Sequence, residues 1–301
     1  MTEITQQTGS WTFDGQAVRI VPGNGKGVHV LRRSLGEVAV PLSALAGVAY
    51  EPGRKGGRLR LRLRDGADPL AHVASGRLPD ASDPYQLPVE PDRAGVAEYF
   101  VEEVRNALLL EQVPAGPCDR FLLPGPAVPL TASGTDGTAS FDGTRVQLEW
   151  NWVTNESKKS GGRRSFTLDE LEAVEWTPAI GWENGSLRLR PKGAQAALKP
   201  EHDPNCLMLW GVRQAKETGG SVLLAAAVTA RLPHPRALSR AADAEPVPSL
   251  DKPRPDGSGT DGPADHDALL RRLRELGELH REGVLTDEEF TAAKAAVLTR
   301  F

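Results

Sequence analysis

The sequence has little cysteine, few aromatic residues and no long apolar run, and each shortage excludes a class of protein. Its two cysteines, Cys118 and Cys206, are far apart and define neither a disulfide framework nor a metal-binding spacing. The longest apolar run, residues 222–228, is far shorter than the ~20 residues of a membrane-spanning helix. The first ten residues are polar and lack the charged start and apolar core of a signal peptide. We therefore expect a soluble cytoplasmic protein.

The chain also lacks a strong excess of charge and a recognisable catalytic motif. Its formal net charge is −4, so there is no overall attraction to nucleic acid or to an anionic membrane. None of the six histidines forms a metal-binding spacing with another histidine or a cysteine. His202 and Asp203 are adjacent, but no activated serine or cysteine motif accompanies them. We expect no catalytic residue, no metal, no cofactor and no nucleic-acid partner.

What the sequence does contain is an internal repeat. The tripeptide Phe-Asp-Gly at residues 13–15 returns at residues 141–143, an offset of 128 (141 − 13). The tetrapeptide Leu-Arg-Leu-Arg at residues 59–62 returns at residues 187–190 with the same offset. A constant spacing between separate landmarks indicates a duplicated unit.

The first copy, expected over residues 10–112, has the pattern of short strands followed by one helix. Leucines alternate with arginines over residues 58–64, which predicts a strand with one buried face. Shorter strands are predicted at residues 28–31 and 70–73, among others. Apolar residues recur every four positions over residues 93–110, which predicts an amphipathic helix. This order favours a small barrel with a helix packed against it.

The second copy, expected over residues 134–232, repeats that order with a longer, basic turn at residues 155–164. Gly219 and Gly220 are poor helix formers, so we begin its closing helix near Ser221. Five of the six tryptophans lie in this copy, where they can serve the core or form a recognition patch. The predicted fold class is α+β, mainly β, with two tandem barrels each closed by a C-terminal helix.

Basic side chains supply the only candidate ligand site in the body of the chain. Six of them lie in the long turn of the second copy and on a later strand: Lys158, Lys159, Arg163, Arg164, Arg188 and Arg190. One interpretation is an anion site for a lipid headgroup or an acidic peptide. The other is a solvated surface whose arginines pair with acids on neighbouring strands. The first copy carries counterparts at Arg58, Arg60, Arg62 and Arg64.

After the repeat, residues 233–264 are rich in Pro, Ala, Ser, Gly and Asp, which predicts a flexible linker. Residues 265–301 predict a helical hairpin, whose second helix begins with a capping box from Thr286 to Glu289. Apolar residues define its candidate association face: Leu269, Leu273, Leu276, Leu285, Phe290 and Val297. Such a hairpin is too small to fold alone. Its apolar face must be buried against another copy of the tail, against another protein, or against the second barrel of the same chain.

The tail, through Gly-Val-Leu-Thr-Asp-Glu-Glu-Phe at residues 283–290, resembles a SHOCT domain, the short C-terminal domain of many bacterial proteins. That resemblance implies an oligomerisation or targeting module. The body, through its two Phe-Asp-Gly turns and Asn-Gly-Ser-Leu at residues 184–187, resembles a bacterial family of unknown function found as two tandem copies before such a tail. Those proteins are thought to be similar to pleckstrin-homology barrels, so the resemblance implies two pleckstrin-homology-like domains.

These features predict a non-enzymatic interaction or scaffold protein. Its two barrels would bind a protein partner, and its tail would mediate oligomerisation or targeting. The alternative is peripheral binding of anionic lipid or of an acidic peptide through the basic turn of the second copy. A hydrolase is the third hypothesis, and the lack of a nucleophile–base set disfavours it.

Overall fold

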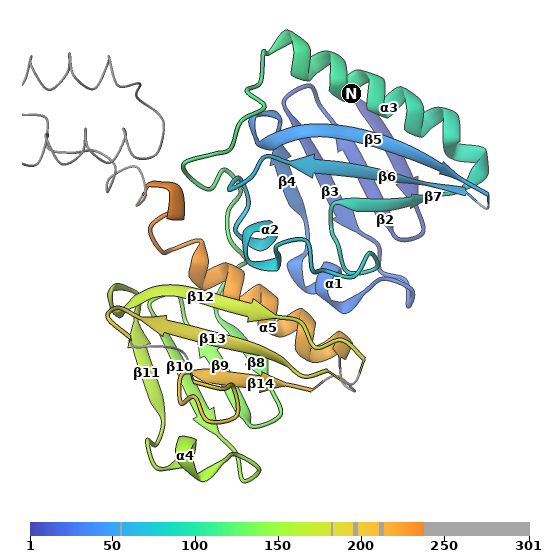
Figure 1. Ribbon diagram of the computed structural model, residues 1–301. Coiled ribbons are helices and arrows are strands. Elements are labelled where there is room, and N and C mark those ends of the chain that lie inside the picture. The colour runs from blue at the N-terminus through green and yellow to red at the C-terminus, as the bar shows by residue number, and fades with distance from the viewer. Residues whose placement is uncertain (55, 182, 195–197, 211–213, 238–301) are drawn as a thin grey trace, which may run out of the picture. The chain divides into compact units, whose positions relative to one another are not determined.

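The computed structural model describes residues 1–54, 56–181, 183–194, 198–210 and 214–237. The predicted linker beyond residue 237 and the whole predicted tail lie outside these residues. Within them the chain is mixed helix and strand, mainly β, and its strands form four antiparallel sheets (Figure 1). The coarse prediction of an α+β fold, mainly β, is confirmed.

The first half contains a four-stranded sheet and a three-stranded sheet. The larger sheet has the order β1 (Thr2–Gln6), β2 (Gly9–Phe13), β3 (Ala17–Pro22), β4 (Val38–Pro41). The smaller has the order β5 (Leu45–Gly53), β6 (Gly56–Leu63), β7 (Gln86–Val89). The helical elements are α1 (Val30–Leu35), η1 (Leu42–Ala44), α2 (Pro69–Ala74), η2 (Pro91–Arg93) and α3 (Ala94–Leu110). The predicted strand at residues 58–64 and helix at residues 93–110 are confirmed as β6 and α3.

The second half repeats the order of the strands and of the closing helix, but its described residues contain no counterpart of α2 or η2. Its four-stranded sheet contains β8 (Leu130–Ser133), β9 (Gly137–Phe141), β10 (Arg145–Trp150) and β11 (Arg164–Thr167). Its three-stranded sheet contains β12 (Leu171–Thr177), β13 (Gly185–Pro191) and β14 (Cys206–Leu209). Its helical elements are α4 (Glu156–Lys159), η3 (Leu168–Glu170) and α5 (Gln214–Thr229). Among the described strands, no ladder joins the two sheets of either half, so neither half is the closed barrel that the sequence predicts.

Two predicted strands are wrong, because local capping selects short helices there. At residues 28–31 the chain enters α1, where His29 caps the helix by accepting a hydrogen bond from the amide of Leu31. At residues 70–73 it forms α2, where Asp68 accepts from two amides of the first turn and Pro69 is the first helical residue. An Asp-Pro pair before an apolar run is a helix start signal that the strand interpretation overlooked.

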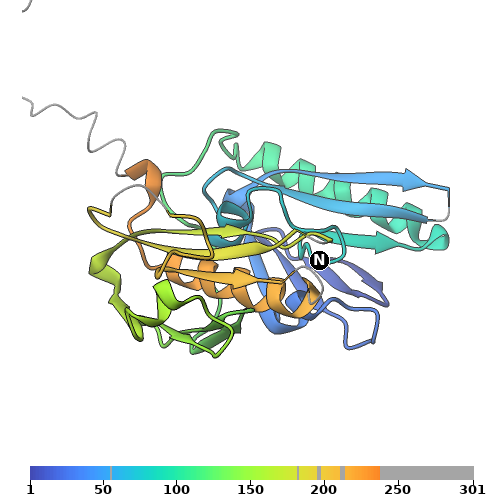
Figure 2. The same cartoon turned by 60° about the horizontal axis from the view of Figure 1, so that its bottom comes forward.

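The predicted start of the closing helix at Ser221 is also wrong, because α5 begins at Gln214 and passes through both glycines. Gly219 lies against α1, where an added Cβ would be 3.3 Å from Cγ1 of Val30. Residues 221–229 are all buried, because α5 packs on the sheets of its own half and on α1 and α2 of the first half. Figure 2 shows α5, in orange, running alongside the strands of the second half. A helix covered on all sides has no polar face, which explains the apolar run in the sequence.

The two halves share apolar packing. In the first half, Trp11 and Phe100 are fully buried. In the second, Trp176 is buried and donates a hydrogen bond to Ser221 on α5. Leu70 of α2 belongs to the core of the second half, so the halves form one compact unit.

Candidate functional site

An exposed tryptophan marks the loop that joins β10 to α4, residues 151–155, here called the Trp152 loop. The side chain of Trp152 is 87% exposed and that of the adjacent Val153 is 51% exposed. No other described aromatic residue is as exposed as Trp152. Two neighbouring apolar side chains in water mark a candidate contact surface. Of the two roles considered for the tryptophans, Trp176 serves the core and Trp152 does not.

Hydrogen bonds fix the backbone of this loop. The side-chain amide of Asn151 donates to the carbonyl of Thr135 at 2.9 Å, and its side-chain oxygen accepts from the amide of Val153 at 2.9 Å. The hydroxyl of Thr154, which is buried, donates to the carbonyl of Asp136. The loop is therefore anchored to the chain just before β9, so its backbone is already ordered.

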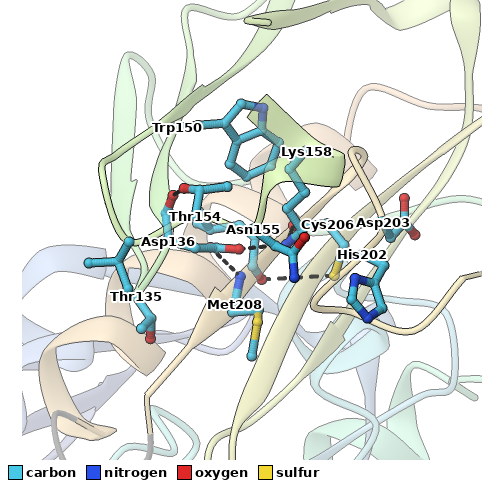
Figure 3. Close-up of polar contacts among 12 residues, drawn as sticks. Thr135, Asp136, Trp150, Thr154, Asn155, Lys158, His202, Asp203, Cys206 and Met208 are labelled. Atoms are coloured by element: carbon cyan, nitrogen blue, oxygen red, sulfur yellow. Dashed lines mark hydrogen bonds and ion pairs between the residues drawn. The ribbon is translucent and has the colours of Figure 1, made fainter. Parts of the chain in front are cut away.

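A buried ion pair lies directly beneath the loop (Figure 3). Lys158 is 0% exposed, and its Nζ lies 2.5 Å from Oδ2 of Asp136 and 2.8 Å from the carbonyl oxygen of Cys206. The same Nζ lies 5.1 Å from the ring centroid of Trp150. The other carboxylate oxygen of Asp136 accepts from the amide of Met208 at 2.9 Å. This Asp136–Lys158 network connects the start of β9 to β14 and so joins the two sheets of the second half.

The first half does not contain this network. Thr8 precedes β2 as Asp136 precedes β9, so the carboxylate is missing. Pro88 stands in β7 at the position that donates an amide to Asp136 from β14, and proline has no amide hydrogen. Arg32 takes the place of Lys158 and is buried, yet its Nε and Nη2 have no hydrogen-bond partner among the described residues. The rigid support beneath the Trp152 loop is therefore specific to the second half.

The predicted anion site is not assembled as expected. Lys158 cannot reach an external anion, so its assignment to that site is wrong. The guanidinium of Arg163 already has a partner, because it forms an ion pair with Glu149. Lys159 lies 3.2 Å from Glu156 and donates to the carbonyl of Trp152, so it also helps to hold the loop.

The remaining three basic residues have partners as well. Arg188 lies 3.2 Å from Asp203, and Arg190 lies 2.9 Å from Glu175. Arg164 donates to the side chain of Asn205 at 3.2 Å. The alternative interpretation, a surface on which basic residues pair with neighbouring acids, describes most of the six. Anion binding by those that reach the surface stays a prediction.

Side chains that could suggest catalysis do not form a relay. Oγ of Ser157 lies 3.5 Å from Nδ1 of His202, but the carboxylate of Asp203 is directed to Arg188 and to the amide of Asn205. Cys206 is a free thiol whose burial raises its pKa, which disfavours the reactive thiolate. Among the described residues, no group of three His, Cys, Asp or Glu side chains is placed to hold a metal ion.

The described helices include none that is both long and apolar enough to cross a membrane. The association face predicted for the tail falls beyond the described part of the chain and stays a prediction. The Trp152 loop and its support were not predicted as a site, because Asp136 and Lys158 are 22 positions apart and follow no local pattern.

Comparison with known families agrees with the duplication. Residues 11–105 and 139–229 match the family described as "Domain of unknown function (DUF4429)". Residues 271–298 match the family described as "Short C-terminal domain", or SHOCT. No curated protein matches the chain. The two matched segments fall in the two halves of the structure, and the resemblance of the tail is confirmed. The chain therefore belongs to the DUF4429 family and carries its domain twice, ahead of a C-terminal SHOCT domain.

Proposed function

We propose that this chain is a non-catalytic interaction protein of the cytoplasm that binds a protein partner through the Trp152 loop. The SHOCT tail would bring copies together or direct them to a target. The observation that carries the proposal is a tryptophan that is 87% exposed on a loop fixed by hydrogen bonds. Together with the adjacent Val153, this side chain offers apolar area on an ordered loop that a partner would remove from water.

The magnitude of the contact supports this role. A tryptophan side chain can bury roughly 150–250 Å². At about 25 cal/mol per Å² this corresponds to roughly 4–6 kcal/mol before losses of entropy. Tryptophan is also enriched among the residues whose removal weakens an interface by about 2 kcal/mol or more. Because Asn151 and Thr154 already fix the loop, less of that gain is lost in ordering it.

We further propose that each half is a pleckstrin-homology-like unit. The four-stranded sheet, the three-stranded sheet and the helix that follows them occur in the same order in both halves. This order supports the resemblance, with two separate sheets in place of a closed barrel. Such a scaffold serves binding through its loops, which fits a contact on the loop between β10 and α4.

The second candidate is peripheral binding of anionic lipid, and one observation favours it. Lys159 and Arg163 follow Trp152 closely in the chain, and a tryptophan beside basic residues suits a membrane interface. The pairing of Arg163 with Glu149 and the burial of Lys158 reduce the charge that this surface can offer. A protein partner is therefore the preferred reading.

The test compares the full chain with Trp152→Ala and with Tyr99→Ala, a control at a half-exposed aromatic residue on α3. Immobilised full chain should capture a partner from its native cytoplasm. W152A should lose that partner and Y99A should retain it, while both keep the thermal stability of the parent. A chain that stops before Asp265 separates the contribution of the tail.

Two outcomes would count against the proposal. Equal capture by W152A and by the parent would show that the loop is not the contact. Co-sedimentation with vesicles containing anionic lipid, weakened by salt and by W152A, would favour the lipid alternative instead.

A further inference from the structure

On the outer face of the three-stranded sheet of the first half, Arg58 pairs with Asp80 at 2.6 Å, but the next two arginines are weakly paired or unpaired. Arg62, which is exposed, makes no hydrogen bond or ion pair with any described residue. Arg60 approaches only Asp80, at 3.9 Å. Nearby, Arg105 of α3 is directed to the backbone, donating to the carbonyl of Val48 at 3.2 and 3.1 Å. This part of the surface is therefore locally positive.

The second half shows how the same surface is neutralised elsewhere in the chain. Arg190, the counterpart of Arg62, lies 2.9 Å from Glu175 and 4.0 Å from Glu172. In the ladder of the second half Glu175 pairs with Arg188, and in the first half Ala49 pairs with Arg60.

Glu172 lies at the register shift between Leu171 and Ala173 in β12. The corresponding register shift in β5, between Leu45 and Gly47, contains Ala46. Two alanines thus stand where the second half carries two glutamates. The first half therefore keeps Arg60 and Arg62 without these two glutamates, and Asp80 reaches only Arg60 of the two, at 3.9 Å.

A groove beside these arginines has the size and lining for an extended segment. Its volume is about 620 Å³, and it runs between β5, β6 and the end of α3. The guanidinium of Arg62 lies across β5, because a Cβ added at Gly47 would be 3.6 Å from its Nη2. Leu109 contributes an apolar side chain that is 76% exposed. Glu51 is the single carboxylate among the lining residues, against three arginines.

We infer that this groove binds an acidic segment of a protein partner. Carboxylates of the segment would meet Arg60 and Arg62, replacing the acids that Glu172 and Glu175 provide in the second half. An apolar side chain of the segment would cover Leu109. Charge-assisted contacts from arginine to carboxylate supply specificity, and the leucine supplies apolar burial.

A polypeptide fits this lining better than a single-stranded nucleic acid. Nucleic acid of that kind is held by aromatic side chains on which bases stack, and no residue lining the groove is aromatic. The inference goes beyond the proposed function, because the groove lies in the other half and shares no residue with the Trp152 loop.

The experiment uses the full chain and a fluorescein-labelled synthetic peptide of about eight residues in which glutamate alternates with leucine. Fluorescence anisotropy should show binding that weakens as salt is added. Ala46→Glu with Ala49→Glu copies the second half onto the first and should weaken binding about tenfold or more, as should Arg62→Ala. Arg190→Ala is the matched control and should bind as the parent does, because that guanidinium is already paired.

Three results would overturn the inference. One is an absence of binding by the parent at low salt. Another is equal binding by the parent and by A46E/A49E. The third is tighter binding of a single-stranded oligonucleotide of equal charge, or of anionic vesicles, with the same dependence on Arg62. Trp152→Ala should bind the peptide normally, so this test is separate from that of the proposed function.

Discussion

Replacement of Lys158 by methionine is the sharpest test of the support beneath the Trp152 loop. The methionine keeps the length of the side chain but leaves the carboxylate of Asp136, whose side chain is 7% exposed, without its charged partner. Breaking a buried ion pair by removing one partner destabilises a protein by about 3–5 kcal/mol. We expect a loss of that size from the free energy of unfolding of Lys158→Met.

The assay is unfolding in urea at pH 7, monitored by circular dichroism. The free energies of unfolding are compared with one shared m-value, the slope of that free energy against urea concentration. The melting temperature should fall by roughly 6–20 °C, because a loss of 1 kcal/mol in the free energy of unfolding lowers it by about 2–4 °C in a domain of this size. Arg163→Ala is the control, because it breaks the exposed pair with Glu149, which is worth about 0–1 kcal/mol.

A double variant, Lys158→Met with Asp136→Asn, extends the test. Removing the charge of Asp136 as well should recover part of the stability, because the buried carboxylate is no longer unpaired. The reasoning is refuted if Lys158→Met costs no more than Arg163→Ala. That result would mean that solvent already screens the pair.

Two further predictions concern the helices between the halves. Burial, with the nearby Arg32 and Arg33, holds the pKa of His29 below its ordinary 6.5. The contribution of neutral His29 to the free energy of unfolding should therefore be fully present above about pH 6.5 and be lost as the pH falls below that value. His29→Asn should reduce this fall in urea titrations at several pH values; an unchanged pH profile would contradict it. Gly220→Ala should stabilise by about 0.5–1 kcal/mol, because its Cβ would meet Ala132 at an ordinary 3.7 Å. Gly219→Leu should lower the melting temperature by pushing against α1, and equal effects at the two glycines would be inconsistent with this packing.

The sequence predicts the elements that local periodicity specifies. Alternation over residues 58–64 and the four-residue spacing over residues 93–110 are properties of the segments themselves, so β6 and α3 were found. The short helices α1 and α2 were missed, because caps and packing against α5 select them over strands. The full length of α5 was missed, because contact with α1 offsets the low helix propensity of Gly219.

The site was harder to predict than the fold. A lysine in a polar turn has the sequence pattern of an exposed charge, and nothing near Lys158 in the sequence indicates that Asp136 lies against it. The exposure of Trp152 was also hidden, because a tryptophan just after a strand is as consistent with a core as with a surface. Both features depend on contacts between segments that are distant in the sequence.

The contact between the halves joins unlike surfaces, since α1 and α2 of one unit meet α5 of the next. A contact of this kind can add units without limit, as in a growing filament. Here α3 carries exposed Glu98 and Glu102, whereas residues 221–229 of α5 are all buried. Burying unpaired carboxylates is costly, so this side of α3 is poorly suited to receive another unit, much as the polar outer face of a terminal repeat suits the end of a solenoid.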